Sequence, residues 1–148
     1  MTINNEQINS SNESEVNRIR SVYDGRDDSR KIDQYAWHQS NVRYQSAVKE
    51  RLLARALSQS LGHDLSKYCM LDVGCGKGSF LRTLIEWGAI PSNLIGTEYL
   101  TDRLKYAESV SPPDIAWHIG GLNFDKEKKF DLVSAQTVFS SILDDDIR

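Results

Sequence analysis

Residues 71–80, which read LDVGCGKGSF, constrain the fold of this chain more than any other segment. A short apolar run ends at Val73, and three glycines then alternate with other residues from Gly74 to Gly78. Apolar residues at one-face helical spacing follow from Phe80 onward. A strand, a glycine loop and a helix in this order bring bare backbone and a helix N-terminus to a nucleotide-like ligand. We therefore expect an α/β domain with a ligand-binding loop after its first strand.

The spacing of the loop glycines narrows the choice of ligand. Gly74, Gly76 and Gly78 follow the pattern G-x-G-x-G, whereas dinucleotide-binding proteins use G-x-G-x-x-G. Glycine has no Cβ, so this backbone can turn sharply and approach a ligand closely. Asp72 is expected either to order the loop by accepting amide hydrogen bonds or to bind a ligand ammonium group through water. The spacing argues against a nucleotide-dependent oxidoreductase.

Strand and helix patterns alternate after this loop. Strands are predicted at residues 68–73, 94–98, 115–119 and 130–135, and helices at 79–87 and 101–110. Thr101 is the predicted N-cap of the second helix, which Pro112 and Pro113 end. Strands that alternate with helices predict a parallel sheet joined by right-handed crossovers.

An acidic residue stands at the predicted carboxyl end of the second strand. Glu98 can accept hydrogen bonds there from the two hydroxyls of a ribose. Tyr99 and Leu100 follow directly and are placed to sandwich the face of an adenine. Together with the glycine loop, this acid indicates a ligand that contains a nucleoside.

Three segments in this order resemble the class I S-adenosylmethionine-dependent methyltransferases. They read LDVGCGKGSF, IGTEYLTDRLKYAE and FDLVSAQTVFSSI, and the resemblance covers residues 68–143. Within this family, the sequence is similar to a subgroup of small bacterial methyltransferases with an N-terminal helical cap. The resemblance implies a Rossmann-like three-layer α/β fold with strands in the order 3-2-1-4-5-7-6. It implies methyl transfer from S-adenosylmethionine to an unidentified small-molecule acceptor; the alternative is a catalytically inactive module that binds S-adenosylmethionine or a partner.

The resemblance also assigns cofactor-binding residues. They are Asp72, Gly74, Cys75, Gly76, Gly78, Glu98, Tyr99, Leu100, Gly121, Leu122 and Gln136. Gly74, Cys75 and Gly76 would line the methionine and ribose portion of the cofactor. Asp72 would hold the loop and the amino-acid end, and Glu98 would bind the ribose hydroxyls.

Two later segments complete the implied site. Residues 120–123 read GGLN and lack the acid with which the family often reaches the adenine amine. Gly121 and Leu122 would act there through their backbone, or Asn123 would substitute. In residues 136–139, Gln136 and Thr137 would place backbone against the cofactor, and the Val138 and Phe139 side chains would pack beside its methyl group.

The part of the chain before the glycine loop is expected to form a lead and a cap. Residues 1–15 are polar and predicted to be disordered, and residues 16–62 are predicted to form a helical cap or lid. A helix is expected at 42–61, with Gly62 as its stop. Its apolar stripe would consist of Val48, Leu52, Leu53, Ala56, Leu57 and Leu61.

Aromatic side chains crowd into residues 31–44. Tyr35, Trp37, His38 and Tyr44 would either pack as a flap onto the domain or close over the ligand as a lid. His38 is the candidate general base, needed only when the acceptor is a protonated oxygen or nitrogen. Tyr35 or Tyr44 would orient the acceptor.

Residues 63–148 are expected to form a partial S-adenosylmethionine-binding domain with only the first four strands of the sheet. The acidic residues 144–146 resemble the first turn of a helix near the chain end, so we interpret the sequence as the front portion of a longer domain. The uncovered fourth strand would invite pairing with a second copy. A homo-oligomer is therefore expected.

Composition excludes several other classes. The 148 residues carry a formal net charge of −3, and no cluster of basic residues advertises nucleic-acid binding. The two cysteines, Cys69 and Cys75, flank one strand without a second Cys or His pair at metal-ligand spacing, so no metal is expected. No signal peptide or membrane-spanning apolar run is visible, and a cytoplasmic location is expected.

Overall fold

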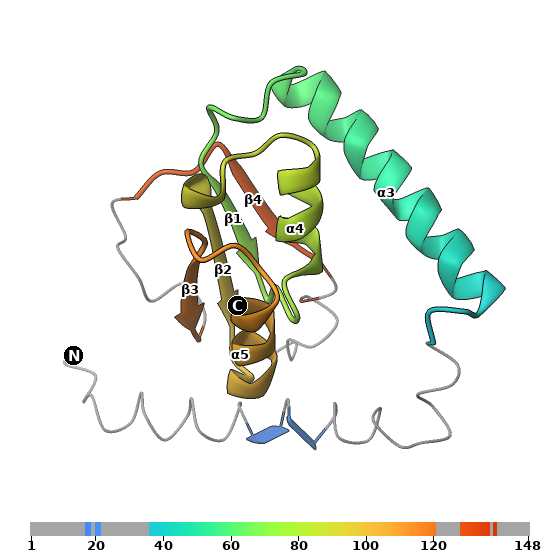
Figure 1. The fold of residues 1–148 in the computed structure, drawn as a ribbon, viewed down its shortest axis with the longest axis vertical. Coiled ribbons are helices and arrows are strands. Elements are labelled where there is room, and N and C mark those ends of the chain that lie inside the picture. The colour runs from blue at the N-terminus through green and yellow to red at the C-terminus, as the bar shows by residue number, and fades with distance from the viewer. Residues whose placement is uncertain (1–16, 19, 22–35, 121–127, 137, 139–148) are drawn as a thin grey trace, which may run out of the picture. The chain divides into compact units, whose positions relative to one another are not determined.

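The computed structural model describes residues 17–18, 20–21, 36–120, 128–136 and 138 (Figure 1). They belong to two compact units, Met1–Gly62 and His63–Arg148. The lead at residues 1–15, residues 31–35 of the aromatic segment and the acidic residues 144–146 lie outside the described residues.

The first unit contains one long helix, α3 (Ser40–Leu61), as the apolar periodicity predicts. Gly62 ends it with a φ of 82°, a left-handed conformation that glycine adopts without strain, and its N–H donates to the Ser58 carbonyl at 3.1 Å. The predicted apolar stripe is only partly buried, because Leu57 is 7% exposed but Leu52 is 57% exposed.

The aromatic side chains described in this unit are largely exposed within it. Trp37 is 77% exposed and Tyr44 is 72% exposed. Their packing onto the domain as a flap, or over the ligand as a lid, stays a prediction. Trp37 contacts His38 edge-on, with ring centroids 5.9 Å apart. Tyr35 lies outside the described residues.

The second unit is built on a four-stranded parallel sheet. Its strands are β1 (Met70–Val73), β2 (Leu94–Glu98), β3 (Ala116–Ile119) and β4 (Leu132–Ala135), in the order β3-β2-β1-β4. This order is the one that the resemblance implies for the first four strands. Cys69 directly precedes β1, and Asp131 directly precedes β4. The Cys69 N–H donates to the Asp131 carboxylate at 2.8 Å, which connects the starts of the two strands. β1 and β4 each begin two residues later than predicted.

Two helices connect neighbouring strands. α4 (Ser79–Glu86) joins β1 to β2 through a 3₁₀ turn, η2 (Pro91–Asn93), and α5 (Thr101–Ser109) joins β2 to β3. α4 is amphipathic and buries Phe80, Leu81 and Leu84. The predicted N-cap of α5 is wrong: Leu100 occupies that position, and Thr101 is already the first helical residue.

The core lies under the two central strands. Met70, Leu71, Leu94 and Ile95 are buried, and β2 is buried along its whole length. The outer strands keep apolar side chains in solvent, since Ile119 on β3 is 67% exposed and Val133 on β4 is 56% exposed. The two central strands therefore contribute most of the buried apolar side chains of the sheet.

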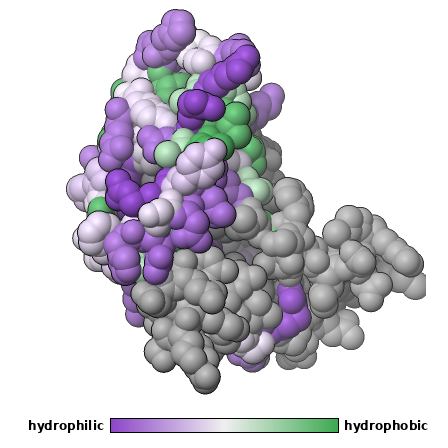
Figure 2. All heavy atoms as spheres, turned by 90° about the vertical axis from the view of Figure 1, so that its right-hand side faces the viewer, coloured by the Kyte–Doolittle hydropathy of each residue, from purple (hydrophilic) through white to green (hydrophobic). Residues whose placement is uncertain are grey.

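The surface of the described residues is mixed. Figure 2 shows one face on which hydrophilic side chains dominate and hydrophobic atoms gather in one area. Among the described residues, no helix combines the length and the apolar character needed to cross a membrane.

Candidate functional site

The glycine loop and Glu98 lie at the same edge of the sheet. Val73 and Thr97 are register partners, so β1 and β2 end side by side. The Cys75 N–H donates to the Thr97 carbonyl at 2.9 Å, which ties the loop after β1 to β2. The Gly120 N–H donates to the Glu98 carbonyl at 2.9 Å, which ties the end of β3 to the same place. This edge is where open parallel sheets bind ligands.

The loop requires its glycines for two physical reasons. Gly74, Gly76 and Gly78 have φ values of 65°, 57° and 72°, which side chains with a Cβ adopt only with strain. A Cβ on Gly74 would lie 2.6 Å from Cγ2 of Val138, and one on Gly78 would lie 2.8 Å from the Trp117 ring. Among the described residues, a Cβ on Gly76 would meet only Oε2 of Glu98, at 4.0 Å. The middle of the loop therefore leaves room for a ligand.

The Glu98 carboxylate is held by two backbone amides. Its Oε2 accepts the N–H of Gly76 at 2.9 Å, and its Oε1 accepts the N–H of Leu100 at 3.0 Å. The residue is 8% exposed. Each carboxylate oxygen can accept more than one hydrogen bond, so both retain capacity for ligand hydroxyls. The carboxylate is thus oriented by one amide from the loop and one at the start of α5.

Asp72 is the second buried acid of this edge, with 3% of its surface exposed. Its register partners are Gly96 on β2 and Ser134 on β4. The Ser134 hydroxyl donates to Oδ1 of Asp72. The loop amide of Gly76 is bound by Glu98 and not by Asp72, although the sequence favours Asp72 for ordering the loop.

The charges of both acids act on the thiol of Cys75. Burial raises the pKa of its thiol to about 12, and the negative charges of Asp72 and Glu98 act in the same direction. The thiol therefore stays protonated near neutral pH.

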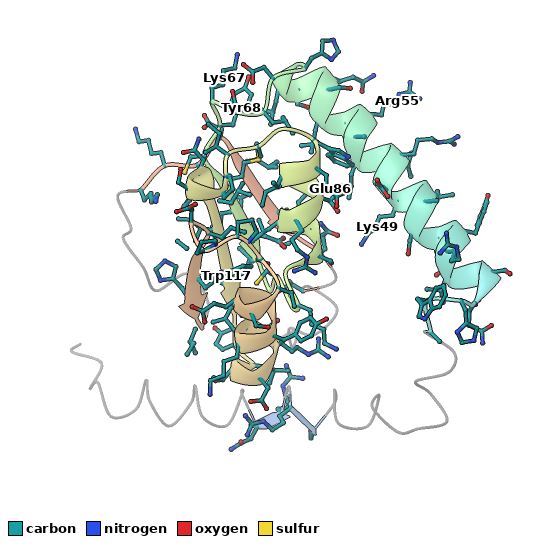
Figure 3. The ribbon with its side chains drawn as sticks, viewed as in Figure 1. Lys49, Arg55, Lys67, Tyr68, Glu86 and Trp117 are labelled. Carbon is teal, nitrogen blue, oxygen red and sulfur yellow. The ribbon has the colours of Figure 1, made fainter. Side chains whose placement is uncertain are left out.

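Trp117 supports the loop from β3, and sequence reasoning missed it. Its ring fills the space beside Gly96, where a Cβ would lie 2.6 Å from Cζ3, and it also reaches Gly78, where a Cβ would lie 2.8 Å from the ring. Figure 3 labels the Trp117 side chain. The signal for this contact was the pairing of a large aromatic residue on one strand with a glycine on the next. That pairing becomes visible only when the register of β2 and β3 is known.

Basic side chains fasten the outer end of the loop. The Arg82 guanidinium donates to the Lys77 carbonyl at 2.8 Å and to the Ser111 hydroxyl at 3.1 Å. Nζ of Lys77 lies 5.3 Å from the centroid of the Tyr106 ring, within cation–π range. The loop is thereby connected to α5 as well as to β2.

Only some of the remaining predicted site residues lie in the described part of the chain. Tyr99 is half-buried and Leu100 is buried directly after Glu98, and Gln136 and Val138 are half-buried after β4. Gly121, Leu122, Asn123, Thr137 and Phe139 lie outside the described residues. His38 belongs to the first unit, and its role as a base stays a prediction. Across the residues that the structure describes, no group of three or more His, Cys, Asp or Glu side chains is arranged to hold a metal ion.

Solved structures similar to this chain are methyltransferases. A magnesium protoporphyrin IX methyltransferase from Synechocystis PCC 6803, solved with bound SAM, is 16% identical with a TM-score of 0.62, covering 89% of this chain and 66% of that protein. An S-adenosylmethionine-dependent methyltransferase from Mesorhizobium loti is 27% identical with a TM-score of 0.44, covering 55% of this chain and 38% of that protein. A TehB-like methyltransferase from Corynebacterium glutamicum is also 27% identical, with a TM-score of 0.47, covering 69% and 59% of the two chains.

The chain therefore spans less than two thirds of the length of these structures. No curated protein sequence matched the chain. A family model described as a methyltransferase domain matches residues 71–148, which is more than half of the 148 residues. The match begins in β1 and includes the loop, Glu98 and β4. This chain belongs to the methyltransferase domain family.

Proposed function

We propose that this chain binds S-adenosylmethionine and contributes to methyl transfer from it to a small-molecule acceptor. The observation that carries the proposal is the Glu98 carboxylate, which the amides of Gly76 and Leu100 hold beside an open glycine loop. A carboxylate at this place suits the two adjacent hydroxyls of a ribose. Membership of the methyltransferase domain family supports this cofactor over a dinucleotide.

The chemistry of the described residues suits such a cofactor. Gly76 leaves space above the loop, so the backbone of Gly74, Cys75 and Gly76 would lie against the methionine and ribose portion. Gly78 gives the loop its last left-handed turn. Asp72 would bind the cationic amino group of the amino-acid end, directly or through water.

The adenine would lie beside the residues that follow Glu98. Tyr99 is half-buried and Leu100 is buried, which suits one wall of an adenine site. Gly121 and Leu122 are proposed for the opposite wall, and Gln136 would place its backbone against the cofactor. These assignments follow the family resemblance residue by residue.

Methyl transfer demands little covalent chemistry from the protein. Bound S-adenosylmethionine supplies an activated methyl group on a sulfonium. The chain's own residues would fix the cofactor by its ribose, through Glu98, and by its amino-acid end, through Asp72. Orientation of this kind, together with exclusion of water, carries much of the rate in an in-line displacement. A protonated acceptor would also require a base, for which His38 remains the predicted candidate.

Isothermal titration calorimetry with S-adenosylhomocysteine tests the cofactor directly. We expect binding of S-adenosylhomocysteine and none of NAD. Binding of NAD alone, or of neither compound, would overturn the proposal. Incubation with S-adenosylmethionine and a panel of small acceptors, read by mass spectrometry, would then show whether a methyl group is transferred. Binding without transfer to any acceptor would favour an inactive cofactor-binding module.

We also propose that β4 pairs with a second copy of the chain. β4 is an outer strand of the described sheet, and Val133 on it is 56% exposed. An unpaired strand edge with apolar side chains favours association. Sedimentation velocity over a range of protein concentrations should show a dimer or larger species, and a monomer throughout would contradict this. The absence of nucleic-acid partners and the cytoplasmic location stay predictions.

A further inference from the structure

Ser134 lies opposite Asp72 across the β1–β4 pair. The two residues are register partners, and the Ser134 hydroxyl donates to Oδ1 of Asp72. On the other side of β1 the register partner of Asp72 is Gly96, which has no side chain. The space beside Gly96 is filled by the Trp117 ring and by Sγ of Cys75. A hydroxyl donor thus reaches this carboxylate from β4, while β2 contributes none at the paired position.

The contact constrains the direction in which the carboxylate points. A carboxyl group rotates easily about its Cβ–Cγ bond, and a hydrogen bond to one oxygen selects one rotation. Asp72 is 3% exposed, so water does not provide this orientation from bulk solvent. A hydroxyl bonded to a charged group also stabilises it more than a bond between neutral groups does.

The charges around Asp72 explain why a neutral donor suits this position. Cys75 on the loop stays a protonated thiol, and Glu98 at the end of β2 is the other acid that acts on it. β4 consists of Leu132, Val133, Ser134 and Ala135, none of which carries a charge. A hydroxyl orients the carboxylate without adding a positive charge of its own. The negative charge of Asp72 is then not neutralised by its partner on β4.

We propose that Ser134 is a positioning residue that acts through Asp72 on the amino-acid end of the cofactor. The inference rests on the proposed function, and it concerns one end of the ligand only. Removal of the Ser134 hydroxyl should weaken binding of a ligand that carries the amino-acid end. It should not affect a ligand that lacks that end.

Isothermal titration calorimetry with two ligands, one with the amino-acid end and one without it, tests this role. S-adenosylhomocysteine carries the amino-acid end, whereas 5′-methylthioadenosine keeps the adenosine and the thioether and lacks it. For Ser134→Ala we expect the affinity for S-adenosylhomocysteine to fall about tenfold, the size of one hydrogen bond to a charged group. The affinity for 5′-methylthioadenosine should stay equal to that of the wild-type chain. Ser134→Thr, which restores a hydroxyl, should recover the lost affinity.

Matched variants complete the experiment. Ser109→Ala removes a hydroxyl that donates to the Tyr106 carbonyl on the exposed end of α5, and it should leave both affinities unchanged. Asp72→Asn should reproduce the selective loss seen for Ser134→Ala. If Ser134→Ala does not fold, Ser134→Cys keeps a similar volume with a weaker donor. It should show a smaller loss for S-adenosylhomocysteine alone.

The outcomes are distinct. Equal losses for both ligands, or no loss for either, would overturn the positioning role while the proposed function stands. Failure of Ser134→Thr to recover the affinity would also count against it. If the wild-type chain binds neither S-adenosylhomocysteine nor 5′-methylthioadenosine, the proposed function itself fails, and the inference fails with it.

Discussion

The backbone N–H of Gly76 donates to Oε2 of Glu98 at 2.9 Å, so the glycine loop and the acid at the end of β2 form one unit. The second oxygen of the same carboxylate accepts the N–H of Leu100 at 3.0 Å, just before α5 begins. One side chain thereby connects the loop after β1 with the helix after β2. Because the carboxylate is already oriented before the ligand binds, binding carries a smaller entropic cost.

Glu98→Gln should weaken cofactor binding and loosen the loop. The amide nitrogen of glutamine would face one of the two backbone N–H groups, donor against donor, and the charge would be lost. We expect the affinity for S-adenosylhomocysteine to fall about 100-fold, the effect of two hydrogen bonds to a charged group. Calorimetry measures it, with Glu108→Gln on the exposed side of α5 as the control. Unchanged affinity would show that Glu98 does not bind the ribose.

Gly78→Ala should destabilise the fold more than Gly88→Ala. Both glycines have positive φ values, 72° and 100°, so both variants carry backbone strain of about 1–2 kcal/mol. A Cβ at Gly88 meets nothing within 4 Å, whereas at Gly78 it lies 2.8 Å from the Trp117 ring. This overpacking should lower the free energy of unfolding of Gly78→Ala by about 1 kcal/mol more. Urea unfolding of the two variants compares them, and equal losses would contradict the contact with Trp117.

Much of the sheet could be predicted from the sequence because its signals are local. The apolar run before Gly74 marks β1, and the Pro91 turn marks the start of β2. Glu98 could be placed beside the loop because parallel strands end at one edge. The predicted N-cap at Thr101 differs from the observed one by a single residue, because local sequence marks the presence of a helix better than its exact end. Glu98 binds the N–H of Leu100, and the helix begins after that residue.

Contacts between distant strands could not be predicted, because they depend on register. Asp72 and Ser134 are separated by 62 positions, and a shift of one residue in β4 would turn Ser134 to the other face of the sheet. The position of Trp117 above Gly96 depends on the β2–β3 register in the same way. The surface that covers the apolar stripe of α3 could not be predicted for a different reason. Periodicity shows which residues share a face, and it does not show what covers that face.

Asp131→Asn should weaken the junction between β1 and β4. The Cys69 N–H donates to the Asp131 carboxylate at 2.8 Å, and the Asp131 N–H donates to the Cys69 carbonyl at 2.9 Å. The substitution keeps the second bond and removes the charge from the first. Because Asp131 is exposed, we expect a loss of about 1 kcal/mol in the free energy of unfolding. Urea unfolding measures it, with the exposed Asp114→Asn as the control, and a loss no larger than that of the control would contradict the role.

The two cysteines should differ in reactivity toward an alkylating reagent. The reactive species is the thiolate, and burial together with Asp72 and Glu98 raises the pKa of the Cys75 thiol to about 12. Cys69 is half-buried, whereas Cys75 is buried. In the folded chain at mildly alkaline pH, we expect iodoacetamide to label Cys69 and spare Cys75, with both labelled in urea. Peptide mapping by mass spectrometry locates the label. Fast labelling of Cys75 in the folded chain would show that the loop opens.

Stability should fall with rising pH in a window set by Cys75. The folded chain holds the thiol proton more tightly than the unfolded chain, whose thiol has a pKa of 9.0, against about 12 when folded. The stability that the Cys75 thiol contributes to the folded chain is therefore complete below pH 9 and is lost as the pH rises toward 12. Cys75→Ala removes this group, so the variant should lose less stability than the wild-type chain between about pH 8 and about pH 10.5. Urea unfolding at the two pH values measures the difference, and Cys69→Ala is the control. Equal pH dependence of Cys75→Ala and the wild-type chain would mean that the Cys75 thiol is not buried in the folded chain.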